Sequence, residues 1–163
     1  MSRRTGAPGG ISLPTPILKG RARMKILFPA DGSPYTKKAL AFLMTHENFC
    51  RPEDELIVLN VQTPMPPRVK SLVGTSAVNQ YHLEEAHRVL DPIEKFIKRH
   101  KLQHSLHHVV GAPAPEILKA VTRHGAHMVV MGTHGHGLLG RALMGSVAQR
   151  VVTESTVPVL LVR

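Results

Sequence analysis

Cysteine and aromatic residues are scarce in this sequence. The 163 residues include one cysteine, no tryptophan, two tyrosines and four phenylalanines. A single cysteine excludes an intramolecular disulfide and any metal site built from several cysteines. With so few aromatic side chains, aliphatic residues and methionine must fill the core. No apolar run approaches the roughly 18 residues of a transmembrane helix, so we expect a cytoplasmic protein with no membrane partner.

Acidic residues are few, and the formal net charge is +10 at pH 7. Half of this excess comes from residues 1–23, which carry five basic residues and no acid. The remaining basic residues are interleaved with acids, and there is little aromatic surface for base stacking. We therefore expect no specific nucleic-acid partner and leave open only a weak, non-specific attraction to polyanions.

The first 23 residues differ in composition from the rest. They contain three prolines and four glycines and show no helical or strand periodicity. Such a segment cannot bury enough apolar surface to order itself. We predict a disordered basic tail at 1–23 and one domain at 24–163.

The rest of the chain alternates buried strands with amphipathic helices. Pro92 is expected to kink or split the second helix, and residues 62–78, with three prolines and a glycine, are expected to form a long loop. The predicted strands are 24–30, 55–61, 105–110, 126–131 and 157–162, and the predicted helices are 34–46, 79–100 (with Leu83 on its inner face), 113–125 and 146–154.

This alternation predicts an α/β fold with right-handed crossovers and a parallel sheet covered on both faces. Ligands of such sheets bind beyond the carboxyl ends of the strands. Asp31, Val61, Gly111 and Gly132 all lie at such ends. Four separate stretches are therefore expected to meet at one crevice.

A glycine-rich stretch at 129–147, VVMGTHGHGLLGRALMGSV, joins a strand to a helix N-terminus. Glycines let the backbone approach a ligand closely, and the unpaired N–H groups of a helix N-terminus attract anions. The order strand, glycine loop and helix therefore predicts a phosphate-binding site.

Two familiar signatures in this loop are incomplete. Gly135 to Gly140 spells GxGxxG, but it follows the fourth strand instead of the first, and no acid follows Glu154, so none stands at the end of the next strand. Gly140 to Ser146 is similar to a P-loop that lacks its lysine. A dinucleotide fold and a standard nucleoside triphosphatase are both disfavoured, whereas phosphate binding is not.

The spacing Gly132-x2-Gly135-x9-Gly145-Ser146 resembles the ATP-binding branch of the universal stress protein family. The resemblance extends to MKILFPADGSPYTKKAL, LIVLNV, VVGAPAPEIL and VPVLLVR, and it covers residues 24–163. It implies a three-layer, open five-stranded parallel sheet of order 3-2-1-4-5, adenine nucleotide alpha hydrolase-like (Rossmann-like). It also implies ATP as ligand, with Mg²⁺ or Mn²⁺ held mainly by the phosphates, and a homodimer through the C-terminal strand.

The resemblance also assigns roles to ten residues. Asp31 would contact the ribose or adenine, and Val61 would hold adenine through its backbone. The remaining residues would line the pocket (Pro29, Ala30), flank the ribose and phosphates (Met131, Gly132, Gly135) or bind phosphate oxygens (Gly145, Ser146, Val147).

Other residues have simpler interpretations. Asp31 could instead end its strand in an Asp-Gly turn, and Gly111 is expected to be a turn glycine. His134, His136 and Arg141 could reach phosphate or be solvent-exposed, so they are not included in the predicted site. Neither His104, His107 and His108 nor His82, Glu85 and His87 has the spacing of a shared metal site.

The leading hypothesis is an ATP-binding regulator of a stress response that acts on an unidentified protein partner. Without a positioned general base or lysine, hydrolysis or self-phosphorylation would be slow or absent. The alternatives are a nucleotide hydrolase or adenylate-transferring enzyme of the same fold, and a nucleotide-free interaction module.

Overall fold

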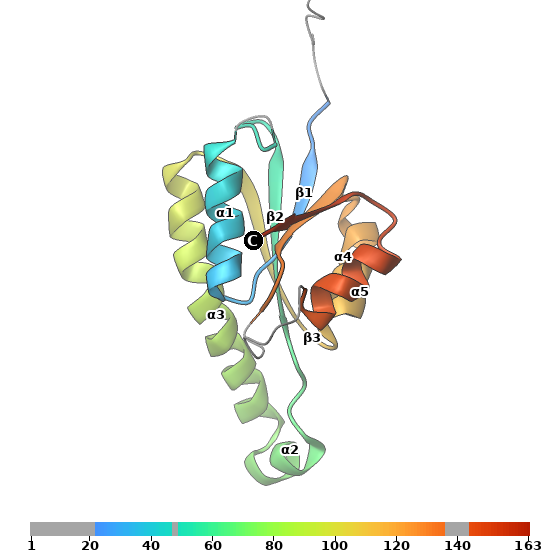
Figure 1. Cartoon of the computed structure of the whole chain (residues 1–163). Coiled ribbons are helices and arrows are strands. Elements are labelled where there is room, and N and C mark those ends of the chain that lie inside the picture. The colour runs from blue at the N-terminus through green and yellow to red at the C-terminus, as the bar shows by residue number, and fades with distance from the viewer. Residues whose placement is uncertain (1–21, 47–48, 136–143) are drawn as a thin grey trace, which may run out of the picture.

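Five parallel strands form one sheet in the order β3-β2-β1-β4-β5, which confirms the predicted order (Figure 1). The computed structural model describes residues 22–46, 49–135 and 144–163. The strand boundaries lie within two residues of the predicted ones. The strands are β1 (Lys25–Pro29), β2 (Glu55–Gln62), β3 (Gln103–Val110), β4 (Met128–Gly132) and β5 (Val159–Val162).

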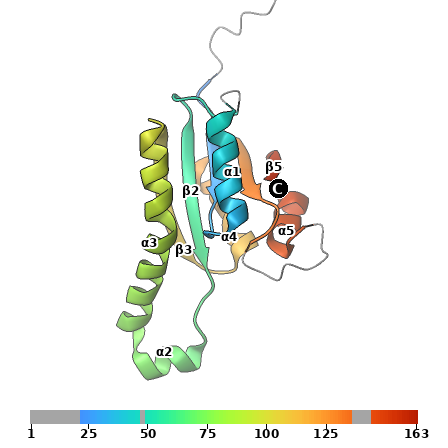
Figure 2. The same ribbon diagram turned by 60° about the vertical axis from the view of Figure 1, so that its left-hand side comes forward.

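Helices cover both faces of the sheet, as Figure 2 shows from a second direction. Alternate residues of the central strands point to opposite faces. Ile26 and Phe28 of β1 pack with α1 and α3, and Leu27 packs with α4 and α5. None of the helices in the described ranges is long and apolar enough to cross a membrane. The helices are α1 (Pro34–Thr45), α2 (Pro67–Val73), α3 (Thr75–Arg99), α4 (Pro113–His124) and α5 (Ser146–Glu154).

The turn from β1 to α1 is held by its own side chains. The Ser33 hydroxyl caps α1 by accepting from the Thr36 N–H at 3.2 Å, as residue type and position lead one to expect. Asp31 Oδ1 accepts from the Ser33 N–H at 2.9 Å and from the Thr36 hydroxyl at 2.6 Å. Gly32 has φ 80°, which a side chain would disfavour. The Asp-Gly-Ser-Pro sequence therefore sets the direction in which the chain leaves the sheet.

The prediction of a long loop at 62–78 is wrong in part. Residues Pro67–Val73 form the short helix α2, which ends at Gly74 with φ 86°, and α3 begins at Thr75. Proline is tolerated in the first turn of a helix because the N–H it lacks would be unpaired there. None of the α2 residues is buried, so no apolar periodicity marked this helix in the sequence.

The expectations for α3 are met only in part. The helix is continuous through Pro92, so it is not split there, and Leu83, expected on the inner face, is exposed while His82 is buried. Pro92 is itself exposed, where water can satisfy the carbonyl that proline leaves unpaired. His82 is accommodated by Gln62 of β2, whose Oε1 lies 2.8 Å from His82 Nδ1 and whose Nε2 donates to the His82 carbonyl. The inner face of α3 therefore carries His82, paired with Gln62, where an apolar contact through Leu83 was expected.

We predict that Leu43→Ala lowers the free energy of unfolding by about 2–5 kcal/mol, the usual cost of truncating a buried leucine. Leu43 is fully buried between α1 and the sheet. Leu72→Ala in α2, where the side chain is 85% exposed, is the matched control and should change the stability by less than about 0.5 kcal/mol. Urea denaturation followed by circular dichroism measures both. Equal losses would contradict the core assignment.

Candidate functional site

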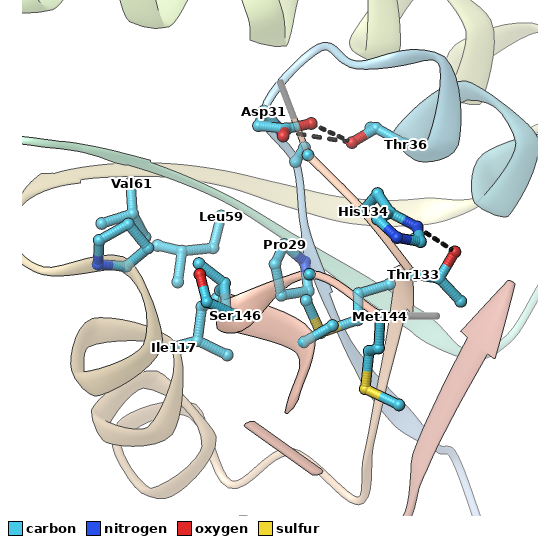
Figure 3. Close-up of a pocket in the computed structure, with 18 residues that line it drawn as sticks. Pro29, Asp31, Thr36, Leu59, Val61, Ile117, Thr133, His134, Met144 and Ser146 are labelled. Carbon is cyan, nitrogen blue, oxygen red and sulfur yellow. Dashed lines mark hydrogen bonds between the residues drawn. The ribbon is translucent and has the colours of Figure 1, made fainter. Parts of the chain in front are cut away.

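A cavity of about 510 Å³ lies at the carboxyl ends of the central strands (Figure 3). This volume is within the range of small-molecule sites, roughly 300–1,000 Å³. All ten residues of the predicted site line the cavity. They are Pro29, Ala30, Asp31, Val61, Met131, Gly132, Gly135, Gly145, Ser146 and Val147. The expected convergence of Asp31, Val61 and Gly132 is therefore present in the structure.

Gly111 is not among the residues that line the cavity. Its N–H donates to the Gln62 carbonyl at 2.8 Å, and a Cβ at this position would lie 2.6 Å from Glu116 Cγ. Close packing against α4 therefore explains this glycine, in keeping with the turn role expected of it.

Asp31 combines a structural role with a position at the cavity. Its Oδ1 holds the start of α1, through Ser33 and Thr36. Its Oδ2 is directed to Gly135, where a Cβ would lie 2.5 Å away. The absence of a side chain at Gly135 therefore lets the carboxylate stand at the cavity edge. Turn formation and ligand contact, which we weighed as alternatives, are compatible uses of the two oxygens.

The other two glycines of the motif allow close approach of backbone to backbone. A Cβ at Gly132 would lie 2.6 Å from Tyr35 Cβ, so the end of β4 can pass the first turn of α1 only as glycine. Gly145 donates its N–H to the Thr133 carbonyl at 2.8 Å, and a Cβ there would lie 3.3 Å from the same oxygen. These contacts bring the start of α5 against the end of β4.

The N-terminus of α5 faces the cavity through Gly145, Ser146 and Val147. Gly145 occupies the N-cap position and has no side chain that could accept from the first N–H groups of the helix. These N–H groups and the positive end of the helix dipole can therefore be offered to an anion. The exposed Ser146 hydroxyl adds a further donor.

Val61 presents its backbone to the cavity for a reason that the strand register reveals. Successive residues of a parallel strand point their N–H and C=O groups to opposite neighbouring strands. The Gln62 carbonyl points to β3, so the N–H and C=O of Val61 point to the β1 side. If β1 continued as a paired strand, the Ala30 carbonyl would accept from the Val61 N–H. That carbonyl accepts instead from the Asn60 side-chain amide at 2.9 Å. Among the described residues no backbone carbonyl pairs with the Val61 N–H, so a ligand can use it.

The walls of the cavity between these polar ends are apolar. Figure 3 shows Pro29, Leu59, Val61, Ile117 and Met144 around the same space. A flat, uncharged ring would fit against such walls, since burying apolar surface is favourable and methionine adapts its shape. The site thus has a carboxylate at one edge, an apolar middle and a helix N-terminus.

Eight of the residues that line the cavity were not predicted from the sequence. Thr36 could have been found, because it lies one helical turn after the capping serine. His134 was considered and not included; its ring lies 5.0 Å from that of Tyr35 and its Nδ1 3.1 Å from the Thr133 hydroxyl. The rest carry no sequence signal. The missed residues are Thr36, Leu59, Pro113, Ile117, Thr133, His134, Met144 and Ala148.

Few ionisable groups lie at the cavity. Within the described lining, the titratable side chains are those of Asp31 and His134, with no lysine and no second carboxylate. The described part of the chain contains no group of three or more potential metal ligands. His136 and Arg141, two of the residues considered in the sequence, lie outside the described residues.

The model of the universal stress protein family matches residues 22–163. A universal stress protein of Thermus aquaticus is 32% identical over 138 residues, which are 85% of this chain and 97% of that protein. Universal stress protein MJ0577 of Methanocaldococcus jannaschii is 28% identical over 154 residues, 85% of this chain and 94% of that one.

Solved structures share the fold. The structure of MJ0577 has a TM-score of 0.74 at 30% identity and covers 85% of this chain and 94% of its own. A universal stress protein in complex with cAMP has a TM-score of 0.65 at 20% identity, with 88% and 99% covered, and shows likeness of fold alone. With a family model matched over all but the first 21 residues, this chain belongs to the universal stress protein family.

Proposed function

We propose that the cavity binds ATP and that the bound nucleotide regulates a stress response through a protein partner. The observation that supports this proposal is the meeting of three groups from distant parts of the chain. These are the Asp31 carboxylate, the Val61 backbone and the N-terminus of α5 around one cavity. A purine, a ribose and a phosphate chain require these three chemistries.

The nucleoside would be held at the carboxyl ends of β1 and β2. A carboxylate accepts strongly from hydroxyl groups, so Asp31 would receive the ribose hydroxyls. The Watson–Crick edge of adenine carries a donor beside an acceptor, and the N–H and C=O of Val61 offer the complement. The apolar walls would cover the faces of the base. The fold relative solved with cAMP binds an adenine nucleotide, which agrees with this choice of base.

The phosphates would lie at Gly145, Ser146 and Val147, against the N–H groups that begin α5. The glycines at 132 and 135 fit this arrangement, because a side chain at either position would collide with Tyr35 or Asp31. Mg²⁺ or Mn²⁺ would be coordinated mainly by phosphate oxygens, since Mg²⁺ commonly binds through substrate phosphates and one or two carboxylates.

Hydrolysis would be slow. A fast phosphoryl-transfer site uses a lysine or arginine on the phosphates and a residue that positions the attacking group. The described residues that line the cavity include no lysine or arginine, and no second carboxylate beside Asp31 that could position the attacking group. We expect turnover below about one per second, the low end for ordinary enzymes; faster release of phosphate would favour the hydrolase alternative.

We predict that Asp31→Asn weakens ATP binding about tenfold to a hundredfold, the cost of a lost hydrogen bond to a charged acceptor. Asparagine keeps an oxygen for Ser33 and Thr36, so the turn before α1 should persist. Isothermal titration calorimetry with Mg-ATP measures the affinity. Asp91→Asn on the exposed face of α3 is the control and should bind like the parent.

Two results would contradict this proposal. If the parent protein fails to bind Mg-ATP at millimolar concentration, the nucleotide-free interaction module is favoured. If Asp31→Asn keeps full affinity while the parent binds, Asp31 does not belong to the binding site.

The Val61 backbone can be tested with proline. We predict that Val61→Pro weakens ATP binding by up to about tenfold, because it removes one N–H donor, while Val61→Ala, which keeps the donor, binds nearly normally. The strand should tolerate proline, since this N–H takes no part in the ladder with β3. Thermal unfolding confirms that each variant is folded. Equal affinities of the two folded variants would exclude a contact through this N–H.

We also propose a cytoplasmic homodimer that pairs through β5. This strand lies at the edge of the sheet, and all four of its residues are only half-buried. An apolar edge of this kind needs a cover, which a second copy can supply.

The register of β5 identifies a selective test of the homodimer. Val162 and Pro158 turn their carbonyls to β4, so the N–H of Leu161 points outward. We predict that Leu161→Pro yields a folded monomer because it removes an outward donor and keeps the bonds to β4. Sedimentation velocity measures the mass of each variant. The control is Leu161→Ala, which keeps the N–H and should remain dimeric. A dimeric Leu161→Pro protein would exclude pairing through this edge.

A further inference from the structure

The end of the sheet opposite the cavity collects basic side chains. The strands begin at this end, and α3 and α4 finish there. Figures 1 and 2 show the start of β1 and the end of α3 at the same end of the molecule, with α2 at the opposite end. The cavity and this surface are therefore separated by the length of the sheet.

On the α4 side, basic residues of three segments meet: the start of β1, the end of α4 and the residue before β4. Lys25 Nζ donates to the His124 carbonyl at 3.2 Å, and the Lys25 N–H donates to His127 Nδ1 at 2.9 Å. Arg123 lies in the last turn of α4 and is exposed. The start of β1 and the end of α4 thus present their charges together.

On the α3 side, exposed Lys95 and Arg99 lie in the last two turns of the helix, and exposed Lys101 lies two residues after its end. The strand register connects the two sides. Gln103, two residues after Lys101, pairs with Glu55, and Glu55 pairs with Lys25. Neighbouring strands lie about 4.8 Å apart, so roughly 10 Å separates the starts of β3 and β1.

The acids at this end are already engaged. Glu55 accepts from Arg23 at 3.3 Å, Glu94 accepts from Lys98 at 2.7 Å, and Glu53 lies 3.8 Å from Arg51. Asp54 is buried and accepts from the Met24 and Arg51 N–H groups. Within the described ranges no carboxylate lies within ion-pair distance of the remaining cations. We call these the basic end: Lys25, Lys95, Arg99, Lys101 and Arg123.

The negative ends of the dipoles of α1, α3, α4 and α5 also lie at this end of the sheet. Each amounts to about half an elementary charge, so α3 and α4, on which Arg99 and Arg123 lie, together offset about one of the five cations, and all four helices offset about two. The behaviour of His124 agrees with a positive local potential. Burial lowers the pKa of His124, the neighbouring charges of His107, Arg123 and Lys25 lower it further, and the charge of Glu55 raises it.

We propose that the basic end binds the phosphate backbone of nucleic acids without sequence preference. Cations spread along a surface can each contact one phosphate, and this contact is independent of base identity. Base stacking is not available to add sequence preference: Phe49, the exposed aromatic near this end, packs against Phe42 with ring centroids 5.3 Å apart.

An anionic membrane is a less suitable partner for this surface. Stable binding to a membrane surface combines basic residues with apolar side chains that insert between the lipids. The three most exposed large apolar side chains of the described residues, Leu72, Val73 and Tyr81, lie instead on α2 and the first turns of α3, at the far end of the molecule, whereas Phe49 and Val152 near the strand starts are less exposed.

The test measures binding of the full chain to a fluorescent DNA duplex of random sequence, by anisotropy at several salt concentrations. With four or five phosphate contacts, the slope of log K against log salt should be about −4. The double variant Arg99→Gln/Arg123→Gln should flatten this slope by about 2 and weaken binding by roughly tenfold or more at low salt. Glutamine is a good helix former, so both helices should remain intact.

The control variant is Arg68→Gln/Lys70→Gln in α2, which removes the same charge at the far end and keeps residues 1–21 unchanged. It should bind the duplex nearly like the parent. Equal weakening in both double variants would show that net charge alone attracts the duplex and would overturn the proposal. No binding by the parent, or full binding by Arg99→Gln/Arg123→Gln, would overturn it too.

Vesicles containing phosphatidylserine provide the membrane comparison at the same salt concentration. If the parent binds these vesicles but not the duplex, and Arg99→Gln/Arg123→Gln no longer binds the vesicles, the surface would be assigned to membranes. That result would overturn the proposal. Because Arg99 and Arg123 are remote from the cavity, the affinity for ATP should be the same in the parent and in Arg99→Gln/Arg123→Gln, and the result stands apart from the ATP-binding proposal.

Discussion

The site of this protein depends on the point where β1 stops pairing with β2. β1 ends at Pro29 and turns into α1, whereas β2 continues to Gln62 along β3. A backbone edge is thereby left without a strand beside it. The Asn60 side chain donates to the carbonyl of Ala30, the residue after β1, so the Val61 N–H is left to the cavity instead of closing the sheet.

The same separation of strands explains the positions of Asp31 and the glycines. Once β1 leaves the sheet, the Asp-Gly-Ser-Pro turn must start a helix within a few residues, and the Asp31 carboxylate is used to hold it. The end of β4 has to pass close to the first turn of α1, which only Gly132 permits. Binding groups and packing constraints therefore share the same residues, and a substitution made to test binding needs a parallel measurement of folding.

The two ends of the sheet have different chemistry because parallel strands place all their starts at one end. Helix C-termini and the loops that precede the strands gather there, and they favour lysine, arginine and histidine. The carboxyl ends instead face the N-terminus of α5 and the glycine loop. A small anionic ligand and an extended polyanion would thus use opposite ends of one molecule.

Several features could be read from the sequence, because each depends on local chemistry. Apolar runs between turn residues located the strands within two residues, and Ser33 and Pro34 marked the start of α1. The resemblance to the universal stress protein family named ten residues, and all ten line the cavity. Their roles toward ATP stay predictions. The helix α2 could not be read, because it buries nothing and leaves no periodic pattern, and the buried His82 was missed because its partner, Gln62, is 20 residues away.

The order of residues along the chain determined that strands and helices alternate, and hence that a parallel sheet would place Asp31, Val61 and Gly132 at one edge. Only the tertiary structure decided what these residues do there. The Val61 N–H is exposed to the cavity because Asn60 takes the carbonyl opposite, and Gly135 lacks a side chain where Asp31 Oδ2 stands. The basic end likewise results from the strand register, since Lys25, Lys101 and Arg123 are far apart in the chain. Contacts of this kind depend on distances across the sheet, which no local pattern encodes.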